Sequence, residues 1–183
     1  MSDRTPITLT PVLVHPSSPV FAEISAWPFA DPFVSRLLRD DIPQRVQFGN
    51  CRLWAYRDPD GQLVGFGTLD VCEDYSVYTA GKPHPYIPLL AANPTVKSKG
   101  YGTTIVRHLI DEAALLGYYL GECHDVLFLD VYTTSVKAIE VYTNCGFIPV
   151  TDPPIPDPQE GGKLYIVMAR RVSVATSPST PPD

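Results

Sequence analysis

The stretch Asn93-Pro94-Thr95-Val96-Lys97-Ser98-Lys99-Gly100-Tyr101-Gly102 joins an apolar run, Tyr86 to Ala92, to an amphipathic segment, Thr103 to Leu116. This order predicts a strand, a glycine-containing turn and the start of a helix. The first amides of a helix have no partner within it, and the helix dipole favours anions at that end. Gly100 and Gly102 would let the backbone come close to a ligand. The stretch therefore predicts a phosphate site, to which Lys97 and Lys99 add positive charge.

The glycine spacing narrows the kind of phosphate ligand. No third glycine follows within Thr103 to Ile105, which disfavours a dinucleotide-binding turn, and the nucleotide P-loop pattern is absent. The run Lys97-x-x-Gly100-x-Gly102, with Pro94 three residues ahead, resembles the pyrophosphate-binding signature of the GNAT superfamily, the acetyl-coenzyme A-dependent N-acetyltransferases. The superfamily usually has Arg or Gln where this sequence has Lys97.

A second motif lies downstream, and it reads Ser-x-x-Ala-x-x-Val-Tyr-x-x-x-Gly-Phe from Ser135 to Phe147. It resembles the late helix of the same superfamily, in which Asn and Leu are usual at positions 135 and 141. Two motifs in the correct order, with one apolar strand run between them, are more specific than either alone. The resemblance covers roughly Leu53 to Arg170.

The hydrophobic pattern predicts one α/β (α+β) domain over residues 1–171 and a disordered Ser/Thr/Pro-rich tail over 172–183. N-cap residues followed by proline open short helices at Ser18 and Asp31, and Gly117 is expected to end the helix that begins at Thr103. A further helix is expected over Ser135 to Asn144. The expected strands are Ile7–Val14, Cys51–Arg57, Gln62–Val71, Tyr86–Ala92, Val126–Val131, Phe147–Val150 and Lys163–Arg171.

These elements match the GNAT fold, a mixed, mostly antiparallel sheet of six to seven strands with helices on both faces. The resemblance implies that Tyr86–Ala92 splays away from Val126–Val131, so that the gap admits the pantetheine arm of coenzyme A. A β-bulge at the end of Tyr86–Ala92 would free backbone groups to bind that arm.

The resemblance also implies roles for individual residues. Tyr142 would be the acid that protonates the leaving thiolate, and the backbones of Leu90 and Ala92 would contact pantetheine. The other expected coenzyme-binding residues come from the two motifs, and they are Lys97, Ser98, Lys99, Gly100, Tyr101, Gly102, Thr103, Ser135 and Ala138.

The general base is a separate question. His84 lies just before the Tyr86 strand and would share its face if the strand reached back that far, and the pKa of histidine is near neutral. An exposed loop position is an equally good interpretation of His84. Asp70 or Glu73 acting through water, or a water chain to solvent without a dedicated base, are the alternatives.

Composition excludes several classes of protein. The net charge is −6 over 183 residues, a poor match to nucleic acid and compatible with a cationic amine. The four cysteines form no C-x-x-C pair, so no metal or redox site is expected. No apolar run is long enough to span a membrane, and the first residues do not resemble a signal peptide, which predicts a cytoplasmic protein.

The predicted function is transfer of an acetyl group from acetyl-coenzyme A to a primary amine of a small molecule, amino acid or peptide. The transfer would occur by direct attack in a ternary complex, and a homodimer is left open. Two alternatives stay open: toxin-type acetylation of aminoacyl-tRNA, and a non-catalytic acyl-coenzyme A-binding module.

Overall fold

The structure is a computed structural model that describes residues 7–96, 100–120 and 125–172. Its strands form one mixed sheet in the order β1-β2-β3-β4-β6-β9-β7, with β5 beside β3 and β8 beside β9. Only β4 and β6 pair in parallel, and every other pairing between the described strands is antiparallel. The strands are β1 (Thr10–Leu13), β2 (Cys51–Arg57), β3 (Leu63–Cys72), β4 (His84–Ile87), β5 (Leu90–Ala92), β6 (Val126–Tyr132), β7 (Ile148–Pro149), β8 (Ile155–Asp157) and β9 (Lys163–Arg171).

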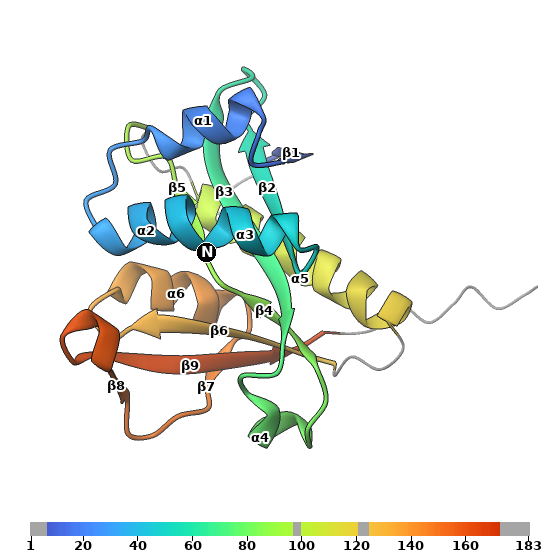
Figure 1. The fold of residues 1–183 in the computed structure, drawn as a ribbon, viewed down its shortest axis with the longest axis vertical. Coiled ribbons are helices and arrows are strands. Elements are labelled where there is room, and N and C mark those ends of the chain that lie inside the picture. The colour runs from blue at the N-terminus through green and yellow to red at the C-terminus, as the bar shows by residue number, and fades with distance from the viewer. Residues whose placement is uncertain (1–6, 97–99, 121–124, 173–183) are drawn as a thin grey trace, which may run out of the picture.

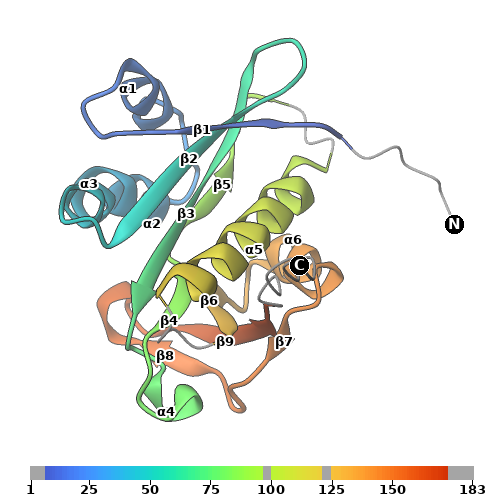
Figure 2. The same ribbon diagram turned by 90° about the vertical axis from the view of Figure 1, so that its right-hand side faces the viewer.

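Helices cover both faces of this sheet, as predicted (Figures 1 and 2). One face carries α1 (Pro19–Ser25), α2 (Pro32–Arg36) and α3 (Ile42–Gln47), with a π-helical turn (Leu37–Asp41) between the last two. The opposite face carries α5 (Tyr101–Leu120) and α6 (Val136–Asn144). A short helix, α4 (Ser76–Thr79), lies between β3 and β4.

Both predicted N-caps at the start of the chain are confirmed. The Ser18 side chain accepts a hydrogen bond from the Phe21 amide at 3.2 Å, and the Asp31 carboxylate accepts one from the Phe33 amide at 3.0 Å. Each cap is followed by a proline, whose missing N–H costs nothing at the first helical position. Asp31 therefore sets where α2 begins, at the edge of the cavity described below.

Three expectations about individual elements need correction. Gly117 does not end the long helix, which continues to Leu120, because glycine is tolerated within a helix at a cost of about 1 kcal/mol. The strand expected over Tyr86–Ala92 is two strands, β4 and β5, and β8 lies in a segment expected to be a loop. Six to seven strands were predicted. With these two changes the described residues contain nine. Val172, assigned to the tail, is buried in the core.

The core has one layer on each side of the sheet. Ile105, Leu109 and Ala113 of α5 are fully buried against β3. This close approach favours glycine in the strand, since a Cβ on Gly65 would lie 2.6 Å from Ile105 Cδ1 and 3.0 Å from the Ala91 carbonyl oxygen. The other layer packs Ile24, Leu38 and other residues of α1 to α3 on the opposite face of β2 and β3. This packing holds α5 against β3. Further along the sheet, the half that contains β3 and β5 diverges from the half that contains β6 and β9.

Candidate active site

The sheet forks between β5 and β6. β4 pairs in parallel with β6 through Tyr86↔Phe128 and Ile87↔Leu129, and no pair between these two halves follows in the described strands. Beyond the fork, β5 continues along β3, while β6 continues along β9 to Tyr132. The splay implied by the resemblance is therefore present, with Pro88 and Leu89 at its base.

A threonine side chain holds the break between β4 and β5. The Thr68 hydroxyl donates to the Leu89 carbonyl at 2.8 Å and accepts from the Leu89 amide at 2.9 Å. The Asn93 amide donates to the Val64 carbonyl at 2.9 Å, so Leu89 and Asn93 both direct their backbone groups toward β3. Because backbone direction alternates along an antiparallel strand, the groups of Leu90 and Ala92 point away from β3, into the fork.

The N-terminus of α5 lies beside this fork. Gly100 has φ +88°, a left-handed conformation that favours glycine, and the first bond of the helix runs from the Thr104 amide to the Gly100 carbonyl at 3.4 Å. The amides of Tyr101, Gly102 and Thr103 thus precede the first intrahelical bond and remain available to an anion. The Tyr101 side chain is buried in the core, so only its backbone can contribute. The predicted phosphate contacts Lys97, Ser98 and Lys99 lie outside the described residues.

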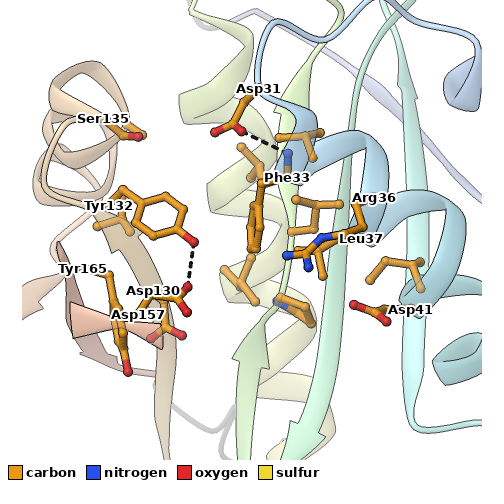
Figure 3. Close-up of a pocket in the computed structure, with 18 of the residues that line it drawn as sticks. Asp31, Phe33, Arg36, Leu37, Asp41, Asp130, Tyr132, Ser135, Asp157 and Tyr165 are labelled. Carbon is orange, nitrogen blue, oxygen red and sulfur yellow. Dashed lines mark hydrogen bonds between the residues drawn. The ribbon is translucent and has the colours of Figure 1, made fainter. Parts of the chain in front are cut away.

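The fork opens into a cavity of about 670 Å³ between its two arms. Leu90 of β5 and three residues of α6, Ser135 at its N-cap, Ala138 and Tyr142, contribute to the wall. Residues of α2, the π-helical turn and the start of α3 form the opposite side, with β6, β8 and β9 completing it. Figure 3 shows Phe33, Arg36 and Leu37 facing Asp130, Tyr132 and Tyr165 across this space.

Tyr142 is the most distinctive polar group in the wall. Its side chain is 7% exposed, and its ring packs edge-on against Phe147 at 6.0 Å. Among the described residues, its hydroxyl has no hydrogen-bond partner. Burial, with a smaller contribution from Cys145, raises the pKa of Tyr142 to about 12, so the phenol keeps its proton at neutral pH. A buried, protonated and unsatisfied hydroxyl is suited to donate to a ligand.

His84 is not among the residues that line the cavity. Its side chain is fully buried, and its ring packs edge-on against Phe128 at 4.8 Å and beside Tyr75 at 5.7 Å. Nε2 lies 3.4 Å from Cys72 Sγ. The expected alternation is correct, because β4 does reach back to His84, but packing around the ring separates it from the cavity. This position does not support a role for His84 as the base.

Asp70 does not line the cavity either. Its carboxylate accepts a hydrogen bond from Arg45 Nη1 at 2.6 Å and another from the Val71 amide at 2.7 Å. Both oxygens of this buried side chain therefore have structural partners. The alternative of Asp70 acting as a base through water gains no support from its position.

One of the carboxylates that do line the cavity, Asp130, was missed by sequence reasoning. It follows the last β4–β6 pair by one residue, at the base of the fork. The Tyr75 and Tyr86 hydroxyls both donate to it, the latter at 3.0 Å. Partial burial raises the pKa of Asp130, and the negative charges of nearby Asp74 and Asp157 add to the rise, although the two tyrosine bonds oppose it. A single acidic residue inside the apolar run Val126–Val131 was the available signal.

A second acidic residue, Asp157, lies at the end of β8. It accepts hydrogen bonds from the Tyr132 hydroxyl at 2.8 Å and from the Gln159 amide at 2.9 Å, and the first of these is the main cause of its lowered pKa. Phe33 of α2 meets the Tyr132 ring edge-on at 5.5 Å, which brings α2 against the β6 arm over the cavity (Figure 3).

Comparison with models of known protein families decides which family the chain belongs to. Residues 20–147 match the model of the acetyltransferase (GNAT) family. The chain belongs to the GNAT acetyltransferase family. This confirms the resemblance seen in the two sequence motifs, and it makes the protein a GNAT-type acyltransferase. No curated protein sequence matches the chain.

Solved structures share the GNAT fold at low sequence identity. A Klebsiella pneumoniae protein provisionally described as an acyl-CoA N-acyltransferase is 20% identical, with TM-score 0.61 over 90% of this chain and 98% of that one. A mutant of the toxin AtaT, bound to the C-terminus of the antitoxin AtaR and to acetyl-CoA, is 16% identical, with TM-score 0.61 over 90% and 94%. Spermidine/spermine N-acetyltransferase SpeG from Vibrio cholerae is 15% identical, with TM-score 0.62 over 89% and 92%.

Two further observations concern metals and membranes. In the described part of this GNAT protein, no group of three or more His, Cys, Asp or Glu side chains is placed to hold a metal ion. Within the same residues, no helix is long and apolar enough to cross a membrane.

Proposed function

We propose that this protein transfers an acetyl group from acetyl-coenzyme A to a primary amine in a ternary complex. The observation that carries the proposal is the unpartnered, buried hydroxyl of Tyr142 at a fork whose free backbone groups belong to Leu90 and Ala92. These groups suit the amide-bearing pantetheine arm, and the first amides of α5 suit its diphosphate. When bound, acetyl-coenzyme A supplies an activated thioester.

The side chains of the protein then position the two substrates and transfer protons. The amine nitrogen bonds to the acetyl carbon, the carbon–sulfur bond breaks, and Tyr142 gives its proton to the departing thiolate. An acceptor that arrives as an ammonium loses two protons in all. One replaces the proton that Tyr142 donates, and the other is released to water, which leaves Tyr142 ready for another cycle. Asp130 is the carboxylate placed nearest the base of the fork to receive a proton from the amine.

The toxin-type alternative, acetylation of aminoacyl-tRNA, is disfavoured by the charge of the cavity. Five aspartates line it, Asp31, Asp40, Asp41, Asp130 and Asp157, and they would repel a phosphate backbone. A non-catalytic binding module is disfavoured because such a module has no use for a buried, unsatisfied phenol beside the cofactor fork.

An acceptor screen tests the proposed function. Purified protein is incubated with acetyl-coenzyme A and a panel of amines, amino acids, peptides and aminoacyl-tRNA, and released thiol is measured. Amine-dependent release supports the proposal. Release only with aminoacyl-tRNA would select the toxin-type activity, and coenzyme binding without release for any acceptor would select the binding module.

A further inference from the structure

The charges that line the cavity are unbalanced. Five aspartates face two arginines, and each arginine is bonded to a carboxylate outside the lining. Arg36 Nη2 lies 2.5 Å from Glu160 Oε1, and Arg45 Nη1 lies 2.6 Å from Asp70 Oδ2. The negative charge of the wall is therefore not neutralised by the two cations present in it.

Some of the charges around the cavity are paired. Glu160, outside the lining, also lies 3.4 Å from Lys163 Nζ, so this carboxylate holds two cations. Asp40 is paired with Arg39 at 2.7 Å. Within the residues that the structure describes, the other four lining aspartates form no ion pair with Lys or Arg, and they are Asp31, Asp41, Asp130 and Asp157.

Two of these carboxylates lie along one face of β6, Asp130 on the strand itself and Asp157 at the end of β8. Asp130 lies at the base of the fork, held by the Tyr75 and Tyr86 hydroxyls. Tyr132 is two residues further along the same face, about 7 Å away at the usual rise of a strand. Its hydroxyl holds Asp157 at 2.8 Å. Each carboxylate is thus fixed by tyrosine donors that leave acceptor capacity facing the cavity.

A further feature marks this space as a ligand site. Tyr142, which is 7% exposed and has no hydrogen-bond partner among the described residues, reaches the same cavity from the opposite face of the sheet. The wall also carries aromatic rings from Tyr86, Tyr132 and Tyr165, and Lys163 Nζ already lies 5.2 Å from the centre of the Tyr132 ring. Such rings pack well against methylene groups and attract ammonium groups.

We propose that the acceptor is a diamine or longer polyamine, whose reacting amine lies at Asp130 and whose second ammonium is held by Asp157. This inference rests on the proposed acetyltransferase function, and the reaction is the same: one nitrogen gains the acetyl group and the thiol leaves. An acceptor with one amine would bring no second ammonium to the Asp157 carboxylate. An acceptor with a carboxylate in place of the second amine would meet like charge there.

Three acceptors of matched chain length test the proposal: 1,4-diaminobutane, butylamine and 4-aminobutanoate. They share the reacting amine and differ only in the remote group, which is an ammonium, a methyl group or a carboxylate. We expect kcat/KM to be at least about tenfold higher for the diamine than for butylamine, and lowest for 4-aminobutanoate. Equal values for the diamine and butylamine would overturn the inference and leave the acetyltransferase function standing.

Two conservative variants test the assignment of the carboxylates. Asp157→Asn should lower kcat/KM for 1,4-diaminobutane by about tenfold or more and leave butylamine unchanged, because only the remote contact is weakened. Asp130→Asn should lower kcat/KM for both amines. Asp60→Asn, in the exposed turn between β2 and β3, is the matched control and should change neither.

The affinity for coenzyme A, measured by calorimetry, should be the same in all three variants. An Asp157→Asn protein that keeps the full preference for the diamine would overturn the assignment of Asp157. If no amine supports thiol release although acetyl-coenzyme A raises the melting temperature, the proposed function itself fails together with the inference.

Discussion

Thr68 is the residue that keeps Leu89 in place at the base of the fork. Its hydroxyl donates to the Leu89 carbonyl at 2.8 Å and accepts from the Leu89 amide at 2.9 Å. The Thr68 amide also donates to the same carbonyl at 2.9 Å. One buried side chain on β3 therefore replaces a backbone partner where β4 ends, and it allows β5 to resume along β3 while β6 departs.

Replacing Thr68 with valine should destabilise the fold and weaken coenzyme binding. Valine has nearly the same shape, so the main loss is the hydrogen bond to the Leu89 amide, which would be left buried and unpaired. A cost of about 1–3 kcal/mol is expected in the free energy of unfolding, measured by urea denaturation. Thr68→Ser keeps the hydroxyl and is the control. Equal stability of the valine and serine variants would show that the hydroxyl does not hold the break.

Substitutions at Gly102 should separate folding from phosphate binding. A Cβ at this position would lie 3.9 Å from Val141, an ordinary contact, so Gly102→Ala should fold without loss of stability. Gly102→Glu adds a carboxylate beside the first amides of α5, where the diphosphate is proposed to bind. We expect a loss of coenzyme A affinity of at least about tenfold in calorimetry. An unchanged affinity in a folded Gly102→Glu protein would count against a diphosphate site at the first amides of α5.

Tyr142→Phe should lower kcat and leave the affinity for coenzyme A nearly unchanged, since only a proton donor is removed. The loss should be about tenfold or more, from the usual contribution of a general acid. The variant should also remain folded, because the hydroxyl has no partner to lose among the described residues. Tyr56→Phe is the control: its hydroxyl bonds His108 Nδ1 at 2.9 Å, outside the cavity lining, and its loss should not change the kinetics. Equal kcat for wild type and Tyr142→Phe would mean that the thiolate leaves without this acid.

Asp130→Asn should change how stability depends on pH. The pKa of Asp130 is raised in the folded protein, so between the unfolded value of about 3.9 and the raised value the folded state binds more protons. The stability of wild type therefore falls as pH rises through that window and levels off above it. The asparagine side chain does not titrate, so the variant should gain relative to wild type as the pH rises above about 4.

Urea midpoints at several pH values measure this gain, and the Asp60→Asn variant corrects for removal of a charge from the surface. A stability difference between wild type and Asp130→Asn that stays constant with pH would show that Asp130 has no raised pKa in the folded protein.

Much of the fold follows from local sequence. Ser18 and Asp31 were recognised as N-caps because capping depends on residues only two or three positions away. β2 and β9 have the predicted bounds because the hydrophobic pattern of each continues over the full length of the strand. The glycine turn before α5 and the motif that contains Tyr142 could be recognised for the same reason, since each motif lies within one short segment of the sequence.

Only the tertiary structure decides which side chains reach the cavity. His84 has the expected strand register but is enclosed by Tyr75 and Phe128, and such packing depends on residues distant in sequence. Asp130 faces the cavity because β4 parts from β6 one residue earlier, a break that Thr68 of β3 holds in place. Local pattern therefore determined the two family motifs, the glycine turn before α5 and the place of Tyr142 in its helix. The acidic, tyrosine-lined wall of the cavity arises from contacts between segments, since β6, β8 and α2 meet only once the chain has folded.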